Sequence, residues 1–399
     1  MINRPKTLLT SLVLGLLLAT AATAAPLKPL ADWMKGLVES GQVVGCMAQI
    51  TQDGETIFLE AYGKRTPKSD DALGTDQVIR IYSMTKAITS AAVMQLVEQG
   101  KIGLDDPVSM YIPEFKDVQV LVDGELEPAR REVTIRDLLT HTSGFTYGFL
   151  ATPAIAPYYR GKLVGTKNLE EAATRIAGMP LLTEPGSAFV YGLSTDVLGR
   201  VVEVGSGMSF GEYLKENIFT PLEMDHTAFV PPADLEPMHI VTPADGQLVI
   251  DEAHYSRENN IFKPDFESGG GGLWSTIGDY SRFCMAMVNL GELDRQRILK
   301  ASTVVFMTQN HLGPGVAAGP GQRFGLGFGI EDAVETSQGP RGAGRWTWGG
   351  AACTYFFIDP RQKLTAVFAT QQFPFNMQMA GDFNRIVLES VAQEDAAQQ

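Results

Sequence analysis

The chain of 399 residues has only three cysteines, Cys46, Cys284 and Cys353, and five histidines. Three scattered cysteines are too few for a disulfide scaffold or for the paired thiols of a structural zinc site, and they allow at most one bridge. The histidines form no H-x-H or H-E-x-x-H pattern and have no neighbouring cysteine. We therefore expect no metal site and no cofactor, and we expect the cysteines to be small apolar residues inside strands or helices.

Basic residues are also scarce, since 32 Lys and Arg stand against 46 Asp and Glu, which gives a net charge of −14. This charge has the wrong sign for neutralising phosphates, so nucleic acids and anionic membrane surfaces are poor candidate partners. A hydrophobic content of 44% excludes a largely disordered chain. At about 150 residues per domain, the length allows two or three domains.

Long apolar runs are absent except near the start, where Arg4 and Lys6 precede the apolar residues 8–18 and the small residues 22–24 follow. This order is typical of a secretory signal peptide, here residues 1–24. The alternative is a retained membrane anchor, but the run is shorter than the ~20 residues that a spanning helix needs. We expect an exported mature protein, periplasmic or secreted, with no membrane span after cleavage.

Segments that favour a sheet occur at both ends of the remaining chain. Helical spacing over residues 26–40 is followed by two strand-like runs on either side of the Asp53-Gly54 turn. Further strands are predicted near the C-terminal end, before a closing helix. The predicted strands cover residues 43–51, 55–62, 345–348, 354–359 and 364–370, and the closing helix covers residues 377–391.

The middle of the chain is mostly helical in its apolar spacing, with predicted helices over residues 84–98, 135–139, 169–176 and 196–204. We therefore predict an α+β or α/β fold with an antiparallel sheet, N- and C-terminal helices flanking it and an inserted helical lobe. The α/β lobe would comprise residues 25–82 plus 265–399, and the helical lobe residues 83–264. The two lobes would form one catalytic unit, with Gly269–Gly272 as a tight turn near their junction.

Two serine motifs compete for the role of nucleophile. Residues 207–211 match G-x-S-x-G, which in α/β-hydrolases places a serine between a strand and a helix. Here the motif follows a helical segment, and Ser209 with Glu212 three residues later is typical of a helix cap. We therefore interpret Ser209 as the N-cap of a helix over residues 213–218.

The second motif is Ser83-Met84-Thr85-Lys86, which lies between a strand-like run, residues 77–82, and an apolar helix. A serine at a helix N-terminus lies near backbone N–H groups that favour developing negative charge. Lys86 is one turn further along the same face, and a neutral amine beside a hydroxyl can accept its proton. The alternative is a capped helix with a solvated lysine, and S-x-x-K by itself does not decide between them.

The segments downstream of Ser83 give this motif its context. They are His141–Phe145, Glu184–Gly186, Tyr191–Ser194, Ser268–Trp274 and Trp348–Ala351. In this order, and over nearly the whole chain after residue 24, the sequence resembles the serine β-lactamase and penicillin-binding protein superfamily. It resembles in particular the family VIII carboxylesterases, which are similar to class C β-lactamases but act on esters. The resemblance implies a β-lactamase/transpeptidase-like fold.

The resemblance also implies roles for individual residues. Ser83 matches the nucleophile, Lys86 its partner and Tyr191 the tyrosine of the second motif. Trp348, Gly349 and Gly350 match the third motif, and Ala351 follows it. The backbone N–H groups of Ser83 and Ala351 would then form the oxyanion hole, and the glycines would let the strand approach an acyl carbonyl.

The sequence departs from the superfamily pattern at two polar positions. The third motif usually begins with a lysine that binds a substrate carboxylate, but Trp348 stands there, and Leu193 replaces an asparagine that can bind an amide. An unpaired carboxylate or amide in a buried site costs about 1–3 kcal/mol or more. Arg345 cannot substitute for the lysine, since an odd spacing from Trp348 on one strand directs it to the other face.

We therefore predict a serine carboxylesterase that cleaves small-molecule esters, preferably with short acyl chains. It would form an acyl-enzyme on Ser83, with Lys86 and Tyr191 sharing proton transfer and Trp348, Gly349, Gly350 and Leu193 binding the substrate. The alternatives are a β-lactamase or D-amino-acid peptidase on the same scaffold, and a penicillin-binding protein without turnover. The aromatic loop over residues 145–159 would form an acyl-binding wall or be held in place by its own rings.

Overall fold

The computed structural model describes residues 27–231, 235, 237–251, 266–319, 322–334 and 344–397. The predicted signal peptide, residues 1–24, lies outside these ranges. The described residues include no helix that is long and apolar enough to cross a membrane. They also include no group of three or more His, Cys, Asp or Glu side chains that could hold a metal ion.

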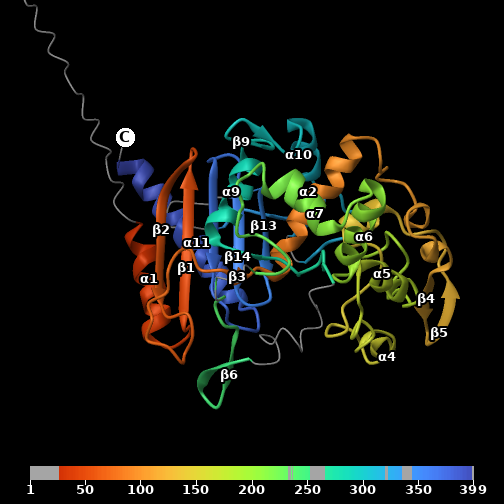
Figure 1. Cartoon of the computed structure of the whole chain (residues 1–399), viewed down its shortest axis with the longest axis horizontal. Coiled ribbons are helices and arrows are strands. Elements are labelled where there is room, and N and C mark those ends of the chain that lie inside the picture. The colour runs from red at the N-terminus through yellow and green to blue at the C-terminus, as the bar shows by residue number, and fades with distance from the viewer. Residues whose placement is uncertain are drawn as a thin grey trace, which may run out of the picture.

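A seven-stranded antiparallel sheet unites the two ends of the chain, as predicted. Its strand order is β11-β12-β13-β14-β15-β1-β2, so strands from the C-terminal part pair with the N-terminal hairpin (Figure 1). The strands are β1 (Gly45–Gln52), β2 (Glu55–Gly63), β11 (Arg323–Phe324), β12 (Gly329–Glu331), β13 (Arg345–Gly350), β14 (Thr354–Asp359) and β15 (Leu364–Ala369). β11 and β12 were not predicted, because runs of two and three residues carry no readable alternation.

Both faces of this sheet are covered. Along β14 every side chain is buried, and successive residues point to opposite faces. Tyr355 and Phe357 pack with the terminal helices α1 (Lys28–Glu39) and α11 (Met377–Ala397). Phe356 and Ile358 join the larger core that continues into the helical part of the molecule.

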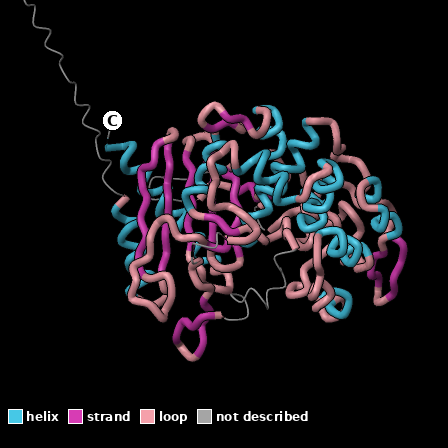
Figure 2. Tube along the Cα trace, in the orientation of Figure 1, coloured by secondary structure: helices cyan, strands magenta, loops and turns pink. Residues whose placement is uncertain are grey.

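Helices from the middle of the chain gather beside the sheet, as Figures 1 and 2 show. At their centre α2 is buried from Thr85 to Leu96, which is typical of a helix that is surrounded by other elements on all sides. α9 covers the sheet face opposite α1 and α11. The helices are α2 (Thr85–Glu98), α3 (Ile135–Leu139), α4 (Ala156–Tyr159), α5 (Leu169–Ala177), α6 (Ser194–Ser206), α7 (Phe210–Leu214), α9 (Ile277–Val288) and α10 (Ala301–Met307).

The segment predicted as a helical lobe also contains two hairpins, β4 (Gln119–Val122) with β5 (Glu125–Pro128), and β6 (Val241–Ala244) with β7 (Gln247–Ile250). The second hairpin is tied to the C-terminal part of the chain, because Val241 N–H donates to Gln371 O and Phe373 N–H donates to Val241 O. The lobe boundaries at residues 82/83 and 264/265 stay a proposal.

Two local predictions need correction. The run over residues 77–82 forms only the two-residue strand β3 (Ile79–Arg80), which pairs with β8 (Trp274–Ser275), and Tyr82–Met84 form a 3₁₀ turn, η1. The helix predicted over residues 213–218 begins earlier, at Phe210, and continues as a π-helical turn, Lys215–Phe219.

The cysteines are free and buried, as expected for apolar packing. Cys46 lies in β1 and Cys284 in α9, but Cys353 lies in the turn after β13 rather than inside a strand or helix. Burial raises the pKa of the Cys46 thiol to about 12. These thiols are therefore packing residues at neutral pH.

The packing of α11 on the sheet predicts a large effect at Phe383. Its ring is fully buried and lies 5.1 Å from the ring of Phe368 and 6.2 Å from that of Phe357, centroid to centroid. Phe383→Ala should lower the free energy of unfolding by about 3–5 kcal/mol, measured by urea denaturation, because it leaves a cavity between sheet and helix. Met377→Ala, in the same helix but 71% exposed, is the control and should change it by less than about 0.5 kcal/mol. Equal effects of the two substitutions would contradict this account of the core.

Candidate active site

Ser83 lies in the η1 turn directly before α2, so α2 begins at Thr85, two residues after the serine. Tyr82, which precedes it, has a φ of +45°, an unusual backbone conformation for a residue other than glycine. Tyr280 supports this turn, because its hydroxyl donates to Met84 O at 2.9 Å. These contacts hold the backbone at Ser83 in place, while the serine itself is only partly buried.

Two residues predicted from the sequence contact the Ser83 hydroxyl. Lys86 Nζ lies 3.2 Å from Ser83 Oγ, and Tyr191 Oη lies 2.7 Å from the same oxygen. Ser83 and Lys86 are neighbours through the helix geometry, but Tyr191 comes from a segment 108 residues further along the chain. The structure therefore places an amine and a phenol each within hydrogen-bond distance of the same serine hydroxyl.

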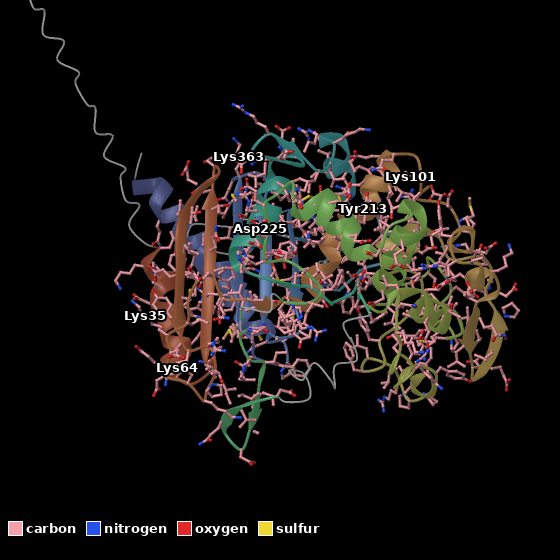
Figure 3. The ribbon with its side chains drawn as sticks, in the orientation of Figure 1. Lys35, Lys64, Lys101, Tyr213, Asp225 and Lys363 are labelled. Carbon is pink, nitrogen blue, oxygen red and sulfur yellow. The ribbon has the colours of Figure 1, made fainter. Side chains whose placement is uncertain are left out.

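Lys86 is 1% exposed, whereas Lys35, Lys101 and Lys363 lie at the outside of the molecule in Figure 3. Its amino group contacts three acceptors: Ser83 Oγ, Tyr147 Oη at 2.9 Å and Gly270 O at 2.6 Å. The three contacts fill the positions around the nitrogen: an ammonium donates to all three oxygens, whereas a neutral amine donates to Tyr147 Oη and Gly270 O and turns its lone pair to Ser83 Oγ. The amine is therefore held in one position.

Tyr147 is a site residue that the sequence analysis did not single out. It comes from the aromatic loop, in which Phe145 and Tyr159 are buried in the core while Phe149 is 76% exposed and stacks on the Tyr147 ring. Burial, followed by the negative charge of nearby Asp196, raises the Tyr147 pKa well above its usual value. The phenol thus stays neutral at pH 7 and can accept from Lys86.

Asp196 and the glycine turn complete the surroundings of Lys86. The predicted tight turn at Gly269–Gly272 is confirmed, and Gly270 supplies the carbonyl that accepts from Lys86. Asp196, 2% exposed, accepts from Ser268 Oγ at 2.5 Å and from Gly270 N–H at 3.1 Å. Burial raises the pKa of Asp196, and the charge of Lys86 opposes this effect. No motif marked Asp196, because it lies inside a predicted helix.

His141 packs against Tyr191, with ring centroids 4.9 Å apart. It is 1% exposed, and burial together with the positive charge of Lys86 lowers its pKa well below the usual value. At this place a neutral imidazole packs against the Tyr191 ring and supports it. It forms no hydrogen bond to Ser83 among those that the structure describes.

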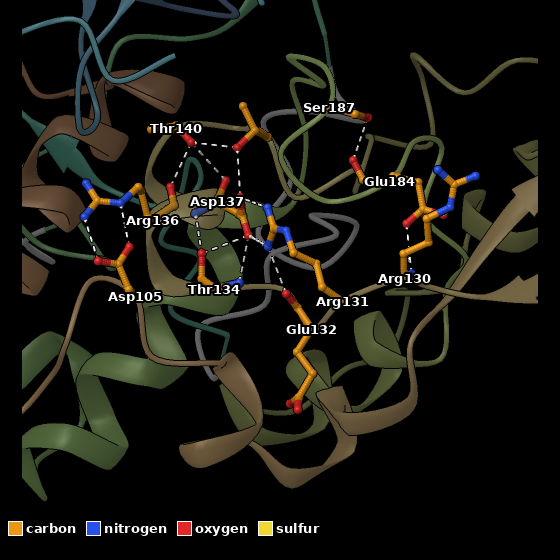
Figure 4. A network of polar contacts seen from close by, with 11 residues as sticks. Asp105, Arg130, Arg131, Glu132, Thr134, Arg136, Asp137, Thr140, Glu184 and Ser187 are labelled. Atoms are coloured by element: carbon orange, nitrogen blue, oxygen red, sulfur yellow. Dashed lines mark hydrogen bonds and ion pairs between the residues drawn. The ribbon is translucent and has the colours of Figure 1, made fainter. Parts of the chain in front are cut away.

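A polar network fixes the segments that carry His141 and Tyr191 (Figure 4). Thr134 caps α3 and forms a capping box with Asp137, whose carboxylate also accepts two hydrogen bonds from Arg131, at 2.6 and 2.8 Å. The chain then continues to His141, whose carbonyl accepts from Val190 N–H at 2.7 Å, directly before Tyr191. The network therefore anchors the segment that leads to His141, and the backbone hydrogen bond from Val190 joins this segment to the one that carries Tyr191.

The third motif lies on β13 and reaches the same phenol. Trp348 Nε1 donates to Tyr191 Oη at 3.3 Å. Arg345, by contrast, is fully buried on the opposite face, where it pairs with Glu331 and packs 5.1 Å from the ring of Phe357. The prediction that Arg345 points away from the site is confirmed. Of the described basic side chains, Lys86 alone hydrogen-bonds to Ser83 or Tyr191.

The two glycines after Trp348 are required by close contacts. A β-carbon at Gly349 would lie 2.7 Å from the ring of Phe375, and one at Gly350 would clash with Ile81 O. Ile81 immediately precedes η1, so this approach brings the end of β13 against the turn that carries Ser83. Ala351, the next residue, packs beside Tyr82.

Two other residues from the sequence analysis lie away from Ser83 or deeper in the protein. Leu193 is 6% exposed and belongs to the main core at the start of α6. Ser209 is exposed, accepts from Glu212 N–H and caps α7, as predicted. Of the two serine motifs, the structure thus surrounds Ser83 with an amine and a phenol and leaves Ser209 as a helix cap.

The chain is similar to known proteins over most of its length. The family described as Beta-lactamase matches residues 30–390. Esterase EstB of Burkholderia gladioli is 31% identical over 353 residues, which cover 82% of this chain and 86% of that protein. Lovastatin esterase of Penicillium rubens is 31% identical over 371 residues, 84% of this chain and 90% of that protein.

Among solved structures, EstCE1, described as a hydrolase with promiscuous acyltransferase activity, superposes with a TM-score of 0.77 at 25% identity, covering 91% of this chain and 97% of its own. The sequence match, the fold and the esterase relatives support a hydrolase or acyl-transfer enzyme. The chain belongs to the beta-lactamase family.

Proposed function

We propose that the protein is a serine carboxylesterase that cleaves small-molecule esters through an acyl-enzyme on Ser83. The observation that carries the proposal is the pair of contacts on Ser83 Oγ, one from Lys86 Nζ and one from Tyr191 Oη. A serine hydroxyl is a weak nucleophile until a neighbouring base takes its proton, and both candidates for that base are in place.

Acylation would proceed by attack of Ser83 Oγ on the ester carbonyl carbon. The Oγ–H bond breaks as the Oγ–C bond forms, and the proton passes to the Lys86 and Tyr191 pair. Collapse of the tetrahedral intermediate breaks the bond to the leaving alkoxide, which takes a proton from Tyr191 Oη. Because the amine, the phenol and the hydroxyl share their hydrogen bonds, the pair is best treated as one titrating unit.

Deacylation would reverse these roles with water as the acceptor. The pair removes a proton from water, the hydroxide oxygen attacks the acyl carbon, and Ser83 Oγ regains its proton as the acid leaves. In both steps the backbone N–H groups of Ser83 and Ala351 would hold the oxyanion. The contact between Gly350 and Ile81 supports this assignment, because it brings the two amides to neighbouring backbones.

Neutral esters fit the site better than β-lactams or peptides. Trp348 occupies the place of a cation and donates to Tyr191, while Arg345 is paired on the other face of the sheet. A substrate carboxylate would therefore be left without a partner. The relatives named as esterases support the same substrate class, and the predicted export of the protein stays part of the proposal.

Replacing the nucleophile gives the first test. Ser83→Ala should lower kcat for p-nitrophenyl butyrate by at least about 1,000-fold, because no other group can form the acyl-enzyme. Ser209→Ala is the matched control and should retain activity within about twofold, since Ser209 only caps α7. Substantial activity in the Ser83 variant together with its loss in the Ser209 variant would reject the proposed nucleophile.

Substrate preference gives the second test. We expect kcat/KM for p-nitrophenyl butyrate to exceed that for a chromogenic cephalosporin by about 100-fold or more, since two polar anchors are missing. Within a p-nitrophenyl ester series, short acyl chains should be preferred. Comparable rates on the cephalosporin would favour a β-lactamase. A mass increase that persists for hours after either substrate is added would instead indicate a penicillin-binding protein without turnover.

A further inference from the structure

In its ionised form, the Asp196 carboxylate carries a charge that its local hydrogen bonds do not require. Its Oδ1 accepts from Ser268 Oγ and from Gly270 N–H, while Oδ2 is buried and has no hydrogen-bond partner in the described part of the chain. A buried charged oxygen without a partner is costly. An asparagine would have the same shape, and its Oδ1 could accept the same two hydrogen bonds without carrying a charge. The charge therefore calls for a function beyond holding the turn.

Gly270 connects this carboxylate to the amine of Lys86. Its N–H donates to Asp196, and its carbonyl accepts from Lys86 Nζ at 2.6 Å. A β-carbon at Gly270 would lie 2.5 Å from Asp196 Oδ2 and 2.7 Å from Tyr147 Oη. The carboxylate and the phenol thus converge on one α-carbon, and Lys86 binds both that phenol and the carbonyl of the same glycine.

The other titratable groups around Lys86 bring no compensating charge. Burial lowers the pKa of His141 and raises that of Tyr147, so both are neutral at pH 7. Tyr191 acts as the proton relay in the proposed reaction. Asp196 is the carboxylate of this set, and its attraction to Lys86 acts across the Gly270 peptide in a region from which water is excluded.

We propose that Asp196 is a positioning residue for Lys86, which holds the Gly270 carbonyl in place and stabilises the ammonium that forms when Lys86 accepts the Ser83 proton. During acylation the Oγ–H bond breaks, the Oγ–C bond forms and the proton resides on Nζ, while Asp196 stays ionised throughout. The buried aspartate of a Ser-His-Asp triad does the same for its histidine. The inference rests on the proposed acyl-enzyme mechanism.

Asp196→Asn separates charge from shape. We expect kcat/KM for p-nitrophenyl butyrate to fall at least about tenfold. The acid limb of its pH profile should move to lower pH, because loss of a negative charge makes proton binding by the site less favourable.

The melting temperature should stay equal or rise at pH 7. Burial raises the folded-state pKa of Asp196, so ionised Asp196 lowers stability above that pKa, and any advantage of the asparagine variant should shrink as the pH falls. A residue with a purely structural role would give the opposite pattern: a lower melting temperature and an unmoved acid limb.

A pair of glycine variants tests the geometry without touching the charge. Gly270→Ala would insert a methyl group between Asp196 Oδ2 and Tyr147 Oη, and activity should fall at least about tenfold. Gly271→Ala is the matched control in the same turn, because its nearest neighbour is the Tyr82 backbone at an ordinary 3.6 Å. It should keep activity within about threefold.

The possible outcomes separate the role of Asp196 from the proposed ester cleavage through Ser83. An active Ser83→Ala variant would remove the acyl-enzyme mechanism itself. If Ser83→Ala is inactive but Asp196→Asn leaves kcat/KM and the acid limb of the pH profile unchanged, only the role of Asp196 is overturned. A melting temperature that falls in the asparagine variant in proportion to its activity would overturn it as well.

Discussion

The buried amine of Lys86 is the constraint on which the arrangement of the site depends. Its nitrogen contacts three oxygens, which come from the η1 turn, the aromatic loop and the glycine turn. A buried donor left without a partner would cost about 1–3 kcal/mol. Contact with this one nitrogen therefore keeps the three segments close together. The lysine is therefore a structural centre as well as a chemical one.

Much of the fold could be predicted from the sequence because its signals are long and regular. Five of the seven sheet strands and most helices alternate or repeat over enough residues to be read, and the antiparallel sheet from both termini followed from them. β11 and β12 could not be read, because two or three residues show no period. The π-helical turn after α7 likewise has no pattern of its own.

For the site, the groups at the Ser83 hydroxyl could be predicted from the sequence, but the groups that surround Lys86 could not. Ser83 and Lys86 are one helical turn apart, and Tyr191 could be matched through motif order. Tyr147 and Asp196 act through tertiary contacts with Gly270, and in the sequence they look like a loop aromatic and a helix aspartate. Only the close approach at Gly270, where a side chain would not fit, brings them together.

The contact of β13 with the η1 turn has a consequence for how the protein is made. Synthesis from the N-terminus produces Ser83 and Lys86 early, but Trp348 and the strand behind it leave the ribosome more than 250 residues later. Until β13 is inserted between β12 and β14, the tyrosine lacks its indole donor and the serine turn lacks the strand that abuts Ile81. The proposed nucleophile is thus not assembled in an incomplete chain, and the proposed ester cleavage would report the completion of folding.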